Sequence, residues 1–326
     1  MKMTKIKKRL YSNQVILKKT SIPPFFSYMN EEIKRLSATG QSGTVQNYRA
    51  AMNSFMKFIK NRNLTLSALT EEIIQKYESW LKNKCLSRNT ISFYMRQLRS
   101  IYNKAVRAGL TKQNFPFKNV YTGIDKTKKR AVEVSVITKL IAMDLTNSYS
   151  LSFARDMFLF SFYMRGMAFV DMAYLKHENI KNGVIRYARH KTDIMMEVRM
   201  EPCISDIINR YASRSKLGYL FPIITSSDAE KAYKQYKNKR SYYNKLLKRL
   251  SQLLGNDVLL TSYVARHSWA TIARNMNISL PVISAGMGHS SENMTRIYLA
   301  SLEASTIDQA NSTILKHIQT AQESMK

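Results

Sequence analysis

The chain has 326 residues, 44% of them apolar, which is long enough for two compact domains that each bury a core. Its 52 Lys and Arg residues outnumber 22 Asp and Glu residues, and the net charge of +30 favours a polyanionic partner such as nucleic acid. A lysine-rich solvated surface or a ribosomal-type protein would carry the same charge, so composition leaves these alternatives open.

The cysteines and the apolar runs argue against several other classes of protein. Cys85 and Cys203 are far apart and form no CxxC pair, so we expect neither a disulfide framework nor a metal site. Residues 1–19 lack the continuous apolar core of a signal peptide, and the run Met157–Met164 is too short to span a bilayer. We therefore expect a cytoplasmic, nucleoid-associated bacterial protein without a membrane segment.

The first part of the chain predicts a basic arm followed by a helical domain. Residues 1–30 are basic, contain Pro23-Pro24 and show no periodicity, which indicates an extended arm. Within residues 31–112, apolar side chains recur at three- and four-residue intervals and predict helices from Thr44 to Ile59, from near Thr70, and from Ser87 to Ala108.

The helix from Ser87 to Ala108 has an apolar stripe and a separate polar stripe. The polar stripe consists of Ser92, Arg96, Arg99, Asn103 and Arg107. Because it holds three arginines and no acid, we expect Arg96, Arg99, Asn103 and Arg107 to contact DNA, with an ordinary solvated face as the alternative.

A basic segment then separates the two halves of the chain. Residues 113–130 break the helical pattern with Pro116 and Gly123 and end in the cationic run 126–130. We interpret residues 113–130 as a basic linker between two DNA-facing domains, which could close around a duplex as a clamp.

The second domain is expected to span residues 131–300 and to be helical apart from one hairpin. Helices are predicted at 132–145, 150–164, 204–214 and 229–254, and as a series from Ser262 onward. Residues 183–200 place Lys191 in a polar centre between two apolar flanks, which indicates a β-hairpin. The predicted fold class is mainly α with a small β-sheet (α+β).

Three motifs follow one another near the C-terminus. They are Tyr263-Val-Ala-Arg266-His267, Gly286-Met-Gly288-His289 and Met294-Thr-Arg-Ile-Tyr298. In this order they resemble the tyrosine recombinase, or phage integrase, family, which carries an HxxR box, a GH box and a tyrosine nine residues beyond that histidine. The resemblance also selects Arg165 and Lys191, and it implies a helical core-binding (SAM-like) domain followed by a mixed α/β catalytic domain.

The resemblance implies a role for each of these residues. Arg165 and Arg266 would clamp the scissile phosphate, because planar guanidinium groups match phosphate oxygens and stay charged. Tyr298 would attack phosphorus and form a 3′-phosphotyrosyl link without metal, nucleotide or other cofactor. Lys191 would protonate the departing 5′ oxygen, and His289 would bind the phosphate and assist proton transfer.

Two positions depart from the family pattern. Tyr263 occupies the histidine position of the HxxR box, where it can orient a group through its hydroxyl but cannot act as an imidazole base. Ala168 stands where the family has an acid three residues beyond the first arginine, and Asp171 is the expected substitute after a short insertion.

The sequence therefore predicts a site-specific DNA recombinase that acts through a Holliday junction in integration, excision or inversion. The expected partners are double-stranded DNA with inverted-repeat sites, three further copies in a homotetramer, and accessory DNA-bending proteins. Residues 301–326 are predicted to form a terminal helix that is exchanged between protomers. The alternatives are a non-catalytic DNA-binding architectural or regulatory protein derived from a recombinase, and a type IB topoisomerase-like enzyme.

Overall fold

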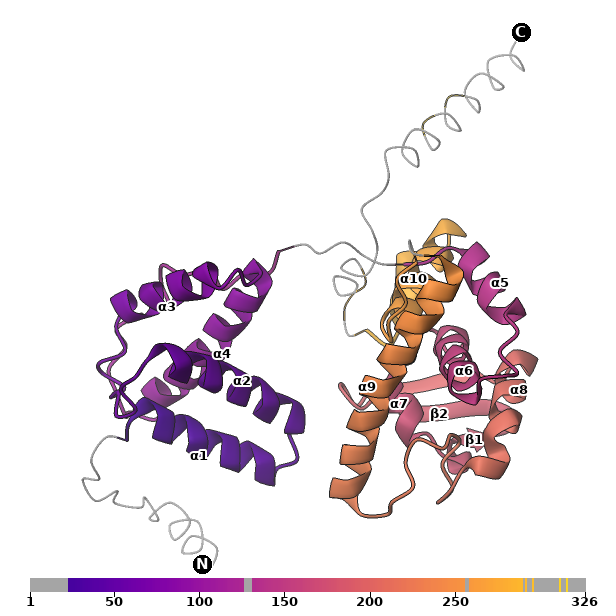
Figure 1. Cartoon of the computed structure of the whole chain (residues 1–326), viewed down its shortest axis with the longest axis horizontal. Helices are drawn as coiled ribbons and strands as arrows, with labels where there is room; N and C mark the ends of the chain where they lie inside the picture. The colour runs from indigo at the N-terminus through magenta and orange to yellow at the C-terminus, as the bar shows by residue number, and fades with distance from the viewer. Residues whose placement is uncertain are drawn as a thin grey trace, which may run out of the picture. The chain divides into compact units, whose positions relative to one another are not determined.

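The computed structural model describes residues 23–125, 131–255 and 258–289, together with residues 291, 295, 311 and 315. The chain divides between residues 127 and 128 into two compact units, which we treat separately (Figure 1). The expected catalytic tyrosine, Tyr298, and most of the expected terminal helix 301–326 lie outside the described residues.

The first unit consists of helices. They are α1 (Phe25–Ala38), α2 (Ser42–Phe58), α3 (Glu71–Asn83) and α4 (Arg88–Arg107). Two of them begin at hydroxyl caps, because the side chains of Thr70 and Ser87 accept bonds from the backbone N–H groups of Ile73 and Thr90. The helices predicted from apolar periodicity are confirmed here to within a few residues at each end.

The first helix begins inside the segment that the sequence suggested as an arm. Phe25 and Phe26, at the start of α1, are 0% and 4% exposed and pack on Phe55 of α2. The N–H of Phe25 donates to the carbonyl of Leu64, which ties the start of the helix to the α2–α3 connection. Apolar burial therefore orders residues 25–30, which have no clear periodicity of their own.

Residues 113–125 also belong to the first unit rather than to a linker. Phe117 and Val120 are 5% and 8% exposed within its core. The hydroxyl of Ser92 donates to the carbonyl of Gly123, and the amide of Asn89 is bonded to the backbone of Asp125 in both directions. This 113–125 segment is therefore fastened along α4, and Ser92 is buried under it rather than part of an exposed stripe.

The second unit places helices around a small antiparallel sheet. The helices are α5 (Val134–Ala142), α6 (Tyr149–Tyr163), α7 (Phe169–Tyr174), α8 (Pro202–Tyr211), α9 (Ala229–Leu254), α10 (Val264–Asn275) and α11 (Leu280–Gly286), with short 3₁₀ turns at His177–Asn179 and Ala212–Arg214. The strands are β1 (Ile180–Lys181), β2 (Val184–Ala188) and β3 (Met195–Arg199), in the order β1-β2-β3.

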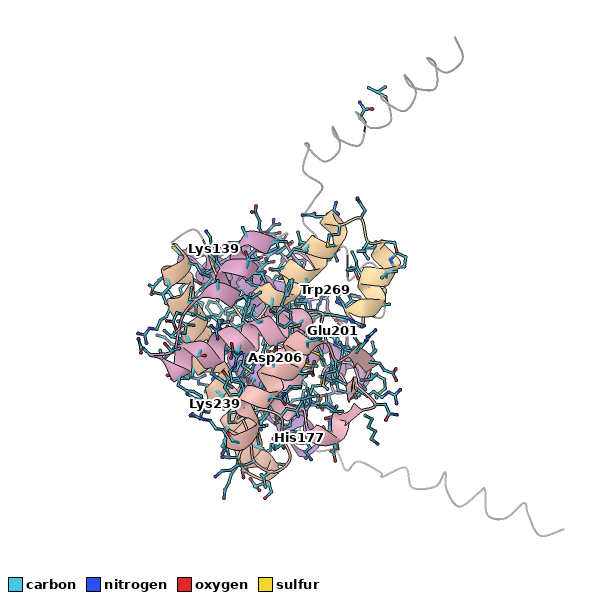
Figure 2. All side chains as sticks on the ribbon, turned by 90° about the vertical axis from the view of Figure 1, so that its right-hand side faces the viewer. Lys139, His177, Glu201, Asp206, Lys239 and Trp269 are labelled. Atoms are coloured by element: carbon cyan, nitrogen blue, oxygen red, sulfur yellow. The ribbon has the colours of Figure 1, made fainter. Side chains whose placement is uncertain are left out.

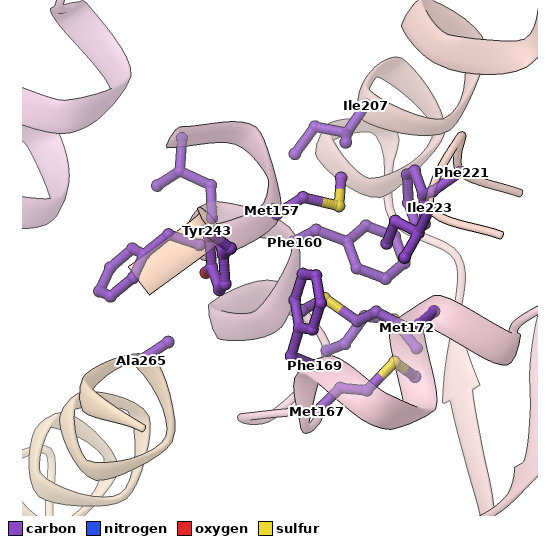
Figure 3. Packing of buried hydrophobic residues seen from close by; sticks show 14 of the residues in the cluster. Met157, Phe160, Met167, Phe169, Met172, Ile207, Phe221, Ile223, Tyr243 and Ala265 are labelled. Carbon is purple, nitrogen blue, oxygen red and sulfur yellow. The ribbon is translucent and has the colours of Figure 1, made fainter. Parts of the chain in front are cut away.

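Helix α6 is the centre of this unit and contacts α5, α7, α8, α9 and α10 (Figure 1). Its side chains are buried on most sides, as Met157 and Phe160 show in Figure 3. Phe160 meets Phe221 edge-on at 4.8 Å between ring centroids, and Phe169 stacks on Tyr243 at 4.6 Å. A helix buried in this way cannot shift without disturbing several neighbouring helices. Its C-terminal end therefore gives the residues that follow it a fixed position.

The hairpin predicted around Lys191 is confirmed. Strands β2 and β3 pair antiparallel with Ala188 opposite Met195, and their inward residues Ile185 and Val198 are 0% and 3% exposed. The predicted fold class, mainly helical with a small β-sheet, is confirmed. Figure 2 draws the side chains as sticks and labels residues of the second unit, among them the exposed Lys139 and Lys239.

Candidate active site

The chain turns sharply at Arg165, directly after α6. Arg165 and Gly166 both lie in the left-handed region, with φ of +57° and +78°. The carbonyl of the buried Ser161 accepts the N–H groups of Gly166 and Met167 at 2.7 and 3.2 Å, and its hydroxyl donates to the Met167 carbonyl. A non-glycine residue with positive φ is uncommon and needs such support, so the turn fixes where Arg165 leaves the helix.

Arg266 on α10 is held against this turn. It is 4% exposed, and its Nη1 donates to the carbonyl of Gly166 at 3.0 Å while its Nη2 donates to the carbonyl of Met287 at 2.6 Å. A Cβ atom on Gly166 would lie 2.6 Å from Cα of Arg266, so only glycine permits this approach. The side chain of Arg165 passes α11, with its Cδ 3.7 Å from where a Cβ of Gly286 would be.

His289 completes this cluster. Its Nε2 lies 2.8 Å from Nη2 of Arg266, and its Nδ1 lies 2.7 Å from the hydroxyl of Thr295, which is fully buried. Burial, the positive charge of Arg266 and that of Arg189 lower the pKa of His289 to about 4. His289 is therefore neutral at pH 7, and it lies within hydrogen-bond distance of Arg266, which is held against the turn that contains Arg165.

Lys191 lies at the exposed tip of the β2–β3 hairpin. The turn is closed by the N–H groups of Thr192 and Asp193, which donate to the carbonyl of Arg189. Asp171 of α7, 6% exposed, accepts the backbone N–H of His190 at 2.8 Å, and burial raises the pKa of its carboxyl group. The acid expected to replace the family's carboxylate thus anchors the residue next to Lys191.

Arg189 connects the hairpin to the GH box, and the sequence did not identify it. Its Nη1 donates to the carbonyl of Gly288, across 99 positions of the chain. Gly288 has φ of +61°, and a Cβ atom there would lie 2.4 Å from Sδ of Met196 and 3.0 Å from Cδ of Arg189. Arg189, directly after β2, and Met196 of β3 therefore pack closely against the residue before His289. The only signal in the sequence was one more cation two residues before Lys191.

Tyr263 lies at the N-cap of α10, one helical turn before Arg266. It is 48% exposed, its N–H donates to the hydroxyl of Thr261, and its ring centroid lies 5.6 Å from that of His267. Tyr263 is thus partly accessible at the start of α10, whereas Arg266 is buried.

The expected DNA-contacting residues lie on α4 of the first unit, and the structure distinguishes them by exposure. Arg107 is exposed, while Arg96, Arg99 and Asn103 are half-buried. Arg99 donates to the hydroxyl of Thr122 at 3.0 Å, and Asn103 accepts from Gln113. The 113–125 segment therefore already engages part of this face.

Within the part of the chain that the structure describes, no group of three or more His, Cys, Asp or Glu side chains is arranged to hold a metal ion. In the same residues, none of the helices is long and apolar enough to cross a membrane.

Comparisons with known proteins show the same fold. Among solved structures, the Tn1549 transposon integrase in complex with a circular intermediate DNA has a TM-score of 0.63 at 15% identity, covering 90% of this chain and 99% of that one. A lambda integrase dimer bound to a COC′ core site has a TM-score of 0.62 at 14% identity, covering 85% and 79%. At such identities the likeness shows the fold.

Another of these structures is a lambda integrase tetramer bound to a Holliday junction, with a TM-score of 0.59 at 12% identity, covering 84% of this chain and 76% of that one. No curated protein matches the sequence. The model of the phage integrase SAM-like domain matches residues 24–121, and the model of the phage integrase family matches residues 132–305, more than half of the chain. The protein therefore belongs to the phage integrase family of site-specific tyrosine recombinases.

Proposed function

We propose that this protein cleaves and rejoins DNA through a 3′-phosphotyrosyl intermediate and a Holliday junction, in the integration, excision or inversion of a DNA element. The observation that carries the proposal is that Arg266 and His289 lie within hydrogen-bond distance of each other, with Arg266 held by the carbonyl of Gly166, directly after Arg165. Two arginines and one imidazole supply fixed donors and an acceptor around a phosphate, which is what phosphoryl transfer requires of a protein.

Each residue has a role that its setting supports. Arg165 and Arg266 would bind the non-bridging oxygens of the scissile phosphate, since guanidinium groups stay charged even when buried. Tyr298 would attack phosphorus, and Lys191, on an exposed and flexible side chain, would give a proton to the departing 5′ oxygen.

The remaining residues of the site would assist. The neutral His289 would accept a hydrogen bond from Arg266 and so help to hold that guanidinium group beside the phosphate. Tyr263 would orient the phosphate through its hydroxyl group in place of the usual histidine. All steps use side chains of the chain itself, so we propose that neither a metal ion nor a nucleotide is needed.

The DNA would be held by both units. On α4, the exposed Arg107 and the half-buried Arg96, Arg99 and Asn103 would contact the duplex, mainly through phosphates. Four protomers would assemble on two double-stranded sites, each with inverted repeats, and residues 301–326 would be exchanged between neighbours. Accessory DNA-bending proteins would help to bring the two sites together.

The test is covalent capture on DNA. The full-length protein is incubated with a nicked suicide duplex whose sequence comes from the end of the DNA element that carries its gene. The buffer contains EDTA and no nucleotide. We expect a protein–DNA adduct that resists denaturing electrophoresis and disappears in Tyr298→Phe. Tyr242→Phe, which changes a 48% exposed tyrosine on α9, is the control and should retain the adduct.

A second substrate tests the role of Lys191. Replacing the 5′-bridging oxygen by sulfur gives a leaving group that departs without a proton, because thiols are far more acidic than alcohols. Lys191→Ala should cleave the oxygen substrate slowly and the sulfur substrate almost as fast as the wild type does. Specific DNA binding without any adduct on either substrate would contradict the proposal and favour a non-catalytic regulatory protein.

A further inference from the structure

The two ring nitrogens of His289 face different kinds of partner. Nε2 lies 2.8 Å from Nη2 of Arg266, and Nδ1 lies 2.7 Å from the hydroxyl oxygen of Thr295. The hydroxyl-bearing residue is 0% exposed, so water does not compete for this contact. Thr295 stands three residues before Tyr298, within the third C-terminal motif, where the family resemblance assigns it no role.

These partners determine where the imidazole proton lies. A guanidinium group has only donors, so Nε2 must present its lone pair to Arg266. The single proton of a neutral imidazole is then on Nδ1, which donates to the hydroxyl oxygen of Thr295. If the proton moved to Nε2, it would point at another N–H group, and the Nδ1 contact would need the hydroxyl to reverse its role.

From this geometry we propose that Thr295 is a positioning residue of the active site, which fixes the Nδ1–H tautomer of His289 and so keeps the Nε2 lone pair directed at Arg266. The role in catalysis rests on the proposed function, whereas the tautomer is a property of the DNA-free protein. Metal-binding histidines are positioned in a similar way: the ring nitrogen that does not bind the metal donates a hydrogen bond to a second residue, which fixes the tautomer.

The charges around His289 act in the same direction. Arg266 approaches from α10 and Arg189 from the hairpin, where it is bonded to the carbonyl of Gly288. Both cations and the burial of the ring oppose a second proton, which agrees with the low pKa of His289. His289 thus begins the reaction as a neutral acceptor whose ring cannot rotate without losing two hydrogen bonds.

Substitutions of Thr295 separate this role from simple packing. Thr295→Ser retains the hydroxyl and loses a methyl group, whereas Thr295→Val retains the shape and loses the hydroxyl. If the hydroxyl fixes the tautomer, Ser should preserve it and Val should not. If Thr295 only fills space, Thr295→Val should behave more like the wild type than Thr295→Ser does, because Val matches the volume of Thr better.

The experiment is ¹⁵N NMR of the full-length, DNA-free protein labelled at histidine, at pH 7. The chain has five histidines, and the resonances lost in His289→Gln identify those of His289. We expect the wild type and Thr295→Ser to show a protonated Nδ1 and an unprotonated Nε2. Thr295→Val should lose that pattern, either through the Nε2–H tautomer or through exchange between the two.

Thr271→Val is the matched control. The hydroxyl of Thr271 on α10 is also buried, but it has no hydrogen-bond partner within the described residues. Its replacement should leave the resonances of His289 at their wild-type positions. Thermal unfolding of each variant shows which spectra come from folded protein, and the wild-type tautomer remains informative even if Thr295→Val does not fold.

Two results would overturn the inference. One is a wild-type His289 that is protonated on Nε2 at pH 7, and the other is a folded Thr295→Val protein with the wild-type resonances. On cleavable DNA, Thr295→Val should also shift the pH profile of adduct formation rather than scale it uniformly. Absence of adduct in every protein would contradict the proposed function and leave the tautomer result standing.

Discussion

At Gly166 the backbone has φ of +78°, and an added Cβ would lie 2.6 Å from Cα of Arg266. Gly166→Ala therefore combines a left-handed alanine, which costs about 1–2 kcal/mol, with a clash in a packed region, which costs about 1–3 kcal/mol more. Gly109→Ala is the control, since Gly109 has φ of +72° and nothing within 4 Å of its added Cβ. Urea unfolding should show the larger loss for Gly166→Ala, and equal losses would refute the close approach.

The neutral His289 makes stability depend on pH. Its pKa is lowered from 6.5 to about 4, so the unfolded chain takes up a proton before the folded one does. The free energy of unfolding should be highest above pH 6.5 and should fall as the pH is lowered toward 4. His289→Gln should flatten this part of the profile, measured by urea unfolding of the second unit at several pH values. The exposed His177, replaced in the same way, should leave it unchanged.

The sequence could identify side chains that act through their own chemistry, but it could not identify those that act through the backbone. Arg266 and His289 stand at fixed motif spacings, and the structure brings them within hydrogen-bond distance. Ser161 and Arg189 bond to main-chain carbonyl groups, which any residue can supply. Such bonds leave no pattern in the sequence, so these residues emerge only from the fold.

At the scale of elements, the 113–125 segment shows where composition misleads. Its proline and glycine residues indicate a break in the helices, and the break is real. Phe117, however, is 5% exposed in the core of the first unit, and nothing in the local pattern distinguishes it from Phe115, which is 64% exposed. Burial at such positions depends on contacts with α3 and α4, which local periodicity does not contain.

Replacing these two phenylalanines provides a direct comparison. Phe117→Ala should destabilise the first unit by about 3–5 kcal/mol, the usual range for a buried phenylalanine. Phe115→Ala should change its stability by less than about 0.5 kcal/mol, as at most surface positions. The chain has two tryptophans, so in a Trp269→Phe background the fluorescence of Trp80 reports urea unfolding of the first unit alone. A linker-like segment would give small effects for both.

The hairpin is the second element whose placement matters. Asp171 accepts the N–H of His190, so Asp171→Ala leaves a backbone donor without its partner, at a cost of about 1–3 kcal/mol. Asp171→Asn keeps an acceptor oxygen and should cost less.

If Asp171 acts by placing Lys191, the alanine variant should form adduct slowly on ordinary DNA and recover on the 5′-sulfur substrate. A defect of the same size on both substrates would show that the anchor serves another part of the site.

For the whole molecule, a net charge of +30 should make DNA binding strongly dependent on salt. Each phosphate neutralised adds about 0.9 to the slope of log affinity against log salt concentration. Arg107→Gln, at the exposed end of α4, should therefore lower the slope by roughly one unit.

Arg35→Gln removes the same charge from a side chain that is already paired with Glu32 at 2.9 Å, and it should leave the slope unchanged. Fluorescence anisotropy over a range of salt concentrations measures both. Equal slopes for Arg107→Gln and the wild type would place the DNA away from this end of α4.

The hold on Arg266 has a consequence for how such a protein can diverge. Its two best-defined acceptors, the carbonyls of Gly166 and Met287, belong to the main chain. The guanidinium group is therefore held by backbone positions rather than by the identity of neighbouring polar side chains, so exposed side chains can change while the cation stays in place. Directed evolution toward new DNA sites can therefore randomise the residues that contact DNA bases, provided that the glycine before Met167 is kept.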